Sequence, residues 1–254
     1  MLSILLQTPY SGGYYEEGSG LLHNLSTSEA FLMIIVVAIV GFIVQARLRA
    51  VFKQNSEKPL PNGMTGAEIA AQMLRDHNIT NVRITHVGGH LTDHFNPVTM
   101  TVNLSDEVYA GRSIAAAAVA CHECGHAIQH AQGYAPLRLR SALVPIVNFS
   151  SRMAPWVILI GLLMTASSSS DIVCWIGVGM IAMSALFSVI TLPVEYNASE
   201  RALAWLEGNR ILRYEEMDGA RQSLRWAART YLVAALSAIA SLLYYIALIN
   251  GRRD

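Results

Sequence analysis

Four long apolar segments set the strongest limit on how this chain can fold. The first is Ala30–Val44, the third is Ile172–Val194 and the fourth is Tyr231–Ile249. A helix needs about 20 mostly apolar residues to cross a bilayer. The third and fourth segments have that length, and the first reaches it with its flanks. The second, near Ala154–Ala166, is shorter and predicts either a full span or a re-entrant segment. We therefore expect an α-helical integral membrane protein with about four transmembrane helices.

The composition supports a membrane location and excludes one class of partner. Charged residues make up 14% of the chain, whereas about 25% is typical of soluble proteins. The formal net charge is zero, so no basic surface is expected and nucleic acid is not a predicted partner. The three cysteines indicate no disulfide framework.

The charge distribution predicts how the chain is oriented in the bilayer. Basic residues follow the first span directly and acidic residues precede it, and cytoplasmic loops carry an excess of Lys and Arg. This bias predicts that the N-terminus lies outside and that residues 47–153 lie in the cytoplasm. The second and third spans then form a hairpin with a short outer loop at Ser167–Asp171. The pair Arg252 and Arg253 near the C-terminus opposes this orientation modestly.

The first cytoplasmic region has the pattern of a small α+β domain. Thr65 and Glu68 form a capping box that predicts the start of a helix. Two runs, Val82–Val87 and Thr99–Leu104, alternate between apolar and polar residues as strands do. The residues between them, Gly88–Pro97, are loop-like.

A helix from about residue 114 to 130 carries the chemistry. His122 and His126 are four residues apart, a spacing that puts both imidazoles on one helix face, where they can share one zinc ion. Glu123 lies beside them and can act as the general base for a zinc-activated water. A surface helix with these residues by chance is the alternative. The wholly apolar run Ala115–Cys121 argues against it, because buried polar side chains need partners.

The third zinc ligand must come from another segment. His130 lies about 80° around the helix from His122, so we interpret it as a polar residue at the helix end. The better candidate is Glu195, which directly follows the third span, because a two-span hairpin returns the chain to the side of the histidines. A helix-capping role for Glu195 is the alternative. Glu200 is a rival ligand, although its neighbour Arg201 favours a surface ion pair.

The remaining polar residues carry weaker signals. Asp93 and His94 lie in the predicted loop, where they either line the cleft or are solvated. The strand over residues 99–104 is either a sheet edge that pairs with an extended peptide or an internal hairpin strand. Cys121 and Cys124 are spaced C-x-x-C, but without a βαβ context we interpret them as packing residues.

These motifs together resemble one family, the bacterial membrane neutral zinc metallopeptidases of the YugP type. The similarity covers Gly63–Trp156 and Leu192–Leu236, more than half of the chain. The residues that carry it are Leu91-Thr92-Asp93-His94, Gly111-Arg112-Ser113, the helix His122–His130 with Gly133-Tyr134, Leu192-Pro193-Val194-Glu195 with Asn197-Ala198-Ser199, and Gly219-Ala220-Arg221.

The resemblance implies a gluzincin-type zinc peptidase in the bacterial inner membrane. It implies Zn2+ as the cofactor, His122, His126 and Glu195 as its ligands, and Glu123 as the catalytic residue. The arrangement is similar to HtpX-like and prenyl-protein membrane peptidases, in which two spans separate the histidine helix from the glutamate. Those relatives often carry Asp where Ser199 stands here. The group that orients the first histidine therefore stays open.

The sequence thus predicts a zinc endopeptidase that acts on membrane or membrane-proximal proteins, with the lipid bilayer and a peptide or protein substrate as partners. The alternatives are a non-catalytic zinc-containing membrane scaffold or adaptor, and a transporter. The oligomeric state stays open. The expected segments are a tail (1–29), a first transmembrane helix (30–46), a catalytic domain (47–153), a transmembrane hairpin (154–194), a second catalytic segment with the third ligand (195–229), and a fourth transmembrane helix with a C-terminal tail (230–254).

Overall fold

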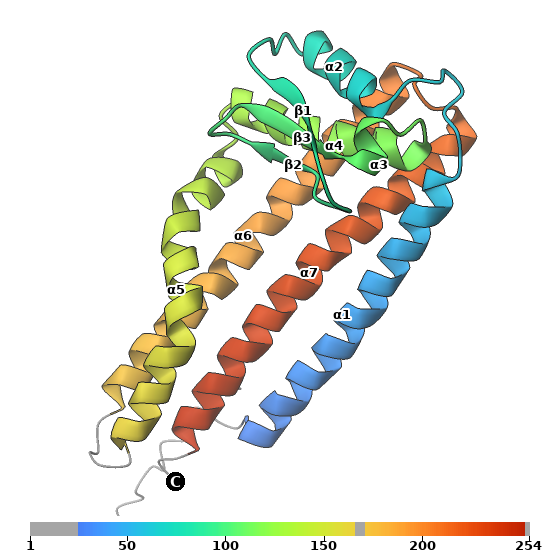
Figure 1. Ribbon diagram of the computed structural model, residues 1–254. Helices are drawn as coiled ribbons and strands as arrows, with labels where there is room; N and C mark the ends of the chain where they lie inside the picture. Colours follow the sequence, from blue (N-terminus) through green and yellow to red (C-terminus); the bar gives the residue numbers. More distant parts are fainter. Residues whose placement is uncertain (1–24, 166–170, 252–254) are drawn as a thin grey trace, which may run out of the picture.

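Four long helices run side by side and carry a compact domain at one end (Figure 1). The computed structural model describes residues 25–165 and 171–251. Residues 1–24 of the expected tail (1–29) and residues 167–170 of the expected outer loop (Ser167–Asp171) lie outside these ranges. The helices pack in the order α1, α7, α6, α5. They are α1 (Thr27–Ser56), α5 (Ala135–Thr165), α6 (Ile172–Gly208) and α7 (Tyr214–Asn250).

All four helices are long and apolar enough to cross a membrane. Large apolar side chains cover their outer faces, as at Phe42, which is 77% exposed, and Leu163, which is 66% exposed. Apolar surface on this scale is normal in lipid and costly in water. The structure therefore confirms the expected fold class, a helical membrane protein with a small α+β domain.

Helix α5 is longer than the apolar segment that predicted it. It is continuous from Ala135, whereas the hydropathy signal begins near residue 154, because Arg138, Arg140 and Arg152 interrupt the apolar pattern before that point. Small residues let α5 and α6 pack closely. A Cβ at Gly161 would lie 2.6 Å from the backbone nitrogen of Cys174. The backbones of α5 and α6 are therefore nearly in contact at this point of the hairpin.

The domain at the end of the helices contains a three-stranded sheet and three helices. The predicted capping box at Thr65 is present and opens α2. The predicted helix over residues 114–130 is also present, as α4. The elements are α2 (Gly66–Asp76), β1 (Arg83–Val87), β2 (His94–Asn96), β3 (Thr101–Ser105), α3 (Asp106–Tyr109) and α4 (Ile114–Ala131).

The sheet corrects two expectations. Its order is β1-β3-β2, with β1 parallel and β2 antiparallel to β3. The loop expected over Gly88–Pro97 is wrong for residues 94–96, which form β2, a strand too short to show an alternating pattern. The strand expected over residues 99–104 is internal, and its interpretation as the edge is wrong. All five residues of β3 are buried, as a central strand requires. Strands β1 and β2 are the two edges, and β2 is the edge that contacts α4.

The hydrophobic core of the domain contains residues from α2, β3 and α4 and also from α6 and α7, which lie much later in the sequence. Ile69 of α2, Leu104 of β3 and Ile128 of α4 are fully buried and pack in one cluster with Leu206 of α6 and Leu224 of α7. Helices α6 and α7 thus continue beyond the apolar segments and form part of the domain. This continuity brings the end of the membrane hairpin against α4.

Candidate metal centre

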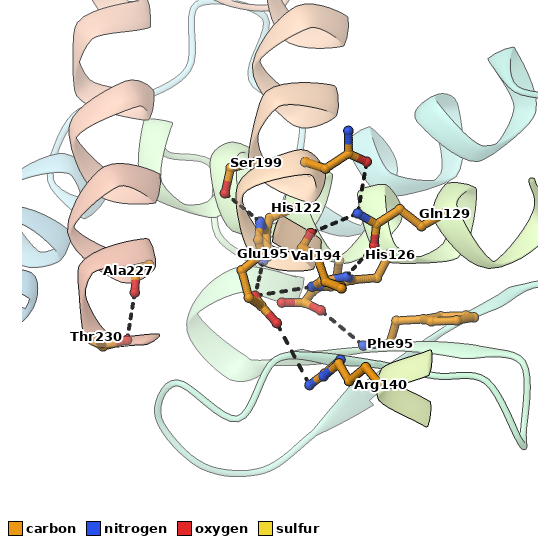
Figure 2. A network of polar contacts seen from close by, with 12 residues as sticks. Phe95, His122, His126, Gln129, Arg140, Val194, Glu195, Ser199, Ala227 and Thr230 are labelled. Carbon is orange, nitrogen blue, oxygen red and sulfur yellow. Dashed lines mark hydrogen bonds and ion pairs between the residues drawn. The ribbon is translucent and has the colours of Figure 1, made fainter. Parts of the chain in front are cut away.

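The candidate site forms where α4 crosses α6 (Figure 2). Helix α4 begins after Ser113, whose hydroxyl accepts a hydrogen bond from the backbone N–H of Ala116, and it presents His122 and His126 on one face. Helix α6 places Glu195 opposite them. Hydrophobic packing of α4 between the sheet and the long helices therefore brings together residues that are about seventy positions apart.

The three side chains converge on one point. The Oε2 atom of Glu195 lies 3.3 Å from Nε2 of His122 and 3.5 Å from Nε2 of His126. In a tetrahedral zinc site with ligand distances of about 2.0–2.2 Å, neighbouring ligand atoms lie about 3.3 Å apart. Among the described residues, these three form the group of His, Cys, Asp and Glu side chains arranged to hold a metal ion. The spacing therefore suits a zinc ion.

Burial gives a second, independent test of that fit. The Glu195 side chain is 2% exposed, and its Oε2 atom is buried with no hydrogen-bond partner in the described part of the chain. A buried carboxylate oxygen without a partner is costly. A divalent cation between this oxygen and the two imidazoles removes that cost, so the residues fit the zinc ion that the sequence predicts.

The other ring nitrogens of both histidines contact polar side chains. Nδ1 of His122 lies 3.1 Å from the hydroxyl of Ser199, and Nδ1 of His126 lies 3.0 Å from Oε1 of Gln129. Contacts of this kind orient metal-binding histidines. Ser199 therefore lies at the position expected for a group that orients His122. Gln129 was missed, although its position one helical turn after His126 is a usable signal.

Glu123 lies beside the three convergent residues and is buried. Its Oε2 atom accepts a hydrogen bond of 3.0 Å from the backbone N–H of Phe95 in β2. Burial raises the pKa of the Glu123 carboxyl above its usual value, and the neighbouring His122 and His126 oppose that rise. One oxygen of the carboxyl is thus held by this hydrogen bond. The other oxygen accepts no hydrogen bond from the described residues.

A cleft of about 120 Å³ opens onto these residues. Asp93 and His94 line this cleft. This was one of the two alternatives from the sequence; the other was that they are merely solvated. Asp93 also holds its loop in place, because its carboxylate accepts hydrogen bonds from the backbone N–H and the hydroxyl of Ser105. Burial raises the pKa of Asp93, and the bonds from Ser105 oppose the rise.

The residues set aside at the sequence level lie away from the convergent group. His130 is exposed, and its ring lies tilted against that of Phe95, with ring centroids 5.7 Å apart. Glu200 is exposed on α6. Cys121 and Cys124 are buried, and burial raises the pKa of both thiols. Both side chains lie in the hydrophobic core of the domain, as the interpretation of these two cysteines as packing residues expects.

Two further residues of the cleft were not foreseen. Arg140 of α5 lies with Nη2 3.8 Å from Oε1 of Glu195, and its buried Nε has no hydrogen-bond partner in the described part of the chain. Tyr231 of α7 lines the same cleft. Arg140 lies in the part of α5 that was expected to belong to the catalytic domain, and Tyr231 lies in the expected fourth transmembrane helix. No short motif marks either residue. Only the packing of the long helices brings them to the site.

Comparisons with known proteins show the family to which the chain is similar. Residues 30–250 match the family described as "Putative neutral zinc metallopeptidase". The chain is 39% identical over 228 residues to the "Putative membrane protease YugP" of Bacillus subtilis (strain 168), a match that covers 88% of this chain and 99% of that protein. No solved structure matches the chain.

Proposed function

Because the chain belongs to this family of neutral zinc metallopeptidases, we propose that it is a membrane-embedded zinc endopeptidase. It hydrolyses peptide bonds of membrane or membrane-proximal proteins. The observation that carries the proposal is the convergence of two imidazole nitrogens on one carboxylate oxygen beside a buried glutamate; within the described residues, that oxygen accepts no hydrogen bond. A closed structural zinc site normally has four protein ligands. Three convergent ligands and an adjacent cleft favour catalysis.

His122, His126 and Glu195 would hold the zinc ion. When bound, zinc acts as a Lewis acid and lowers the pKa of a coordinated water to about 7. The ligand set, two histidines and one glutamate, is one of the known catalytic sets, and it leaves a position for water.

Glu123 moves the proton. Its carboxylate accepts a proton from the attacking water, whose oxygen forms a bond to the carbonyl carbon of the substrate. The same carboxyl then donates that proton to the departing amine as the C–N bond breaks, so protons balance over the cycle. The hydrogen bond from the Phe95 backbone holds one oxygen of Glu123. It thereby fixes the direction in which the other oxygen faces the cleft.

Arg140 and strand β2 would position the substrate. Arg140 lines the cleft, and its Nε has no hydrogen-bond partner among the described residues. Its guanidinium can therefore donate to the carbonyl oxygen of a peptide bond, where negative charge develops. Strand β2 is the edge of the sheet beside the cleft. An extended peptide can bind beside such an edge through its backbone. The sequence suggested this peptide-binding role for the strand over residues 99–104. That strand is central in the sheet, so we assign the role to β2 instead.

The site faces the cytoplasm at the surface of the bacterial inner membrane. The basic residues from Arg47 to Lys58 support this orientation. Glu195 lies on α6 directly after its apolar segment, so the metal would lie within about one helical turn of the bilayer edge. The substrates of such a site are juxtamembrane segments or misfolded membrane proteins.

The test is a comparison of membrane-fraction peptides between cells with the wild-type protein and cells with Glu123→Gln. New protein termini that depend on Glu123 support the peptidase. Zinc retained by the purified protein, with identical peptides in both strains, would instead support the non-catalytic scaffold.

A further inference from the structure

Gln129 contacts both His126 on its own helix and the helix α6 that carries Glu195. It lies on α4 with 0% of its surface exposed, one helical turn after His126. A buried amide is retained at little cost only when its donors and its acceptor are all satisfied. The partners of Gln129 therefore show how its side chain is oriented.

The amide nitrogen of Gln129 contacts two acceptors on α6. It lies 2.8 Å from the carbonyl oxygen of Val194 and 3.0 Å from Oδ1 of Asn197. A carbonyl can only accept, so the NH2 group must face α6. The orientation of Asn197 is fixed in turn, because its Oδ1 also accepts a hydrogen bond of 2.7 Å from Nε of Arg201, which can only donate.

This orientation determines the state of His126. With its NH2 group committed, Gln129 presents Oε1 to Nδ1 of His126 at 3.0 Å. An amide oxygen only accepts, so Nδ1 must carry the hydrogen. The lone pair of the neutral ring is then on Nε2, the atom that faces Glu195 (Figure 2). His122 differs, because the hydroxyl of Ser199 can donate or accept and does not select a tautomer.

We infer that Gln129 is the positioning residue of the metal centre, which locks His126 in the metal-binding tautomer and orientation. The same side chain binds the carbonyl of Val194, the residue before Glu195. This bond holds the amide in the orientation that presents its oxygen to His126. This inference rests on the proposed zinc site, and it predicts an effect on zinc affinity that does not depend on any substrate.

The experiment measures the zinc dissociation constant of the full-length protein in detergent by competition with a chelator. Gln129→Met removes the acceptor and both donors at similar size, and we expect zinc affinity to fall by about 10–100-fold. Gln129→Glu keeps an acceptor for His126 but turns its second oxygen toward the two acceptors on α6. We expect this contact to lower the Tm, while zinc affinity of the folded protein stays closer to wild type than that of Gln129→Met.

The matched control is Gln132→Met, near the end of the same helix. Gln132 also links α4 to α6, through a hydrogen bond of 2.7 Å from Arg201, but it touches none of the three proposed ligands. We expect wild-type zinc affinity from this variant. The inference is overturned if Gln129→Met binds zinc like wild type. It is overturned equally if Gln129→Glu is as weak as Gln129→Met, because the side chain would then act only as a bridge.

Two further outcomes are distinguishable. If Gln129→Met does not fold, Gln129→Glu decides alone, because tight zinc binding without the two donations supports the inference and weak binding contradicts it. If the wild-type protein binds no zinc, the proposed function fails, and the inference that rests on it fails with it.

Discussion

Gly125 of α4 and Ala198 of α6 are in backbone contact, because a Cβ at position 125 would lie 2.6 Å from the carbonyl oxygen of Ala198 and 3.1 Å from its Cα. Gly125 lies between Glu123 and His126, and Ala198 follows Glu195 by less than one turn of helix. The separation of the two helices at this contact therefore sets the distance between the histidines and the glutamate.

Gly125→Ala should push the helices apart at the metal centre. The obstacle is backbone, which cannot rotate away, and overpacking of this kind costs about 1–3 kcal/mol. We expect weaker zinc binding and a lower Tm. Gly208→Ala is the control, since a Cβ there meets nothing within 4 Å. Equal zinc affinity in Gly125→Ala and wild type would show that the contact does not define the site.

Metal analysis tests the ligand set. The purified protein should contain one zinc per chain, and His126→Ala should lose nearly all of it, because two remaining ligands hold zinc poorly. Glu195→Ala should lose it as well. Glu200→Ala is the matched control, because Glu200 is an exposed carboxylate on the same helix. A protein that keeps its full zinc after Glu195→Ala has another third ligand.

Glu123→Gln should separate metal binding from catalysis. The amide keeps the size of the side chain but cannot accept the proton from water, so turnover should fall by about 10²–10⁴-fold while zinc content stays at the wild-type level. Turnover and zinc content are measured on the same preparation. An active Glu123→Gln enzyme contradicts the role of general base.

Arg140→Gln should retain zinc and reduce kcat by about 10²–10³-fold, the loss expected when one donor to the developing negative charge is removed. Arg138→Gln, at an exposed position on the same helix, is the control and should behave as wild type. If Arg140→Gln loses its zinc, Arg140 instead supports Glu195, which it approaches at 3.8 Å.

Cysteine labelling in intact cells tests the orientation. A cysteine introduced at Thr80, an exposed position of the compact domain, should be protected from an impermeant reagent. One at Ser168 should react. The three native cysteines are buried, so background labelling should be low. The reverse pattern would place the metal centre on the outer face.

The residues recoverable from sequence were those with a local spacing or a topological constraint. His122, Glu123 and His126 lie within five consecutive positions, and their helix has a clear capping residue. The case for Glu195 came from counting membrane crossings, and the structure brings it within 3.5 Å of both histidines. The first signal is a spacing within one short stretch, and the second is an even number of membrane crossings. Both can be read from the sequence without a three-dimensional structure.

The residues that were missed depend on tertiary packing. Strand β2 has three residues, and its pairing with β3, not its own sequence, makes it a strand. No sequence motif links Arg140 of α5 or Tyr231 of α7 to α4. Their approach to the site depends on how α5 and α7 pack against α6. Long-range packing of this kind leaves no periodic trace in a single sequence.

The position of the α5–α6 hairpin between the two halves of the metal centre affects how the protein matures. During synthesis His122 and His126 emerge first, and Glu195 cannot reach them until α5 and α6 have both entered the bilayer and returned the chain. A nascent or wrongly inserted chain therefore lacks a complete zinc centre. In the proposed peptidase, proteolytic competence would therefore follow only from correct insertion.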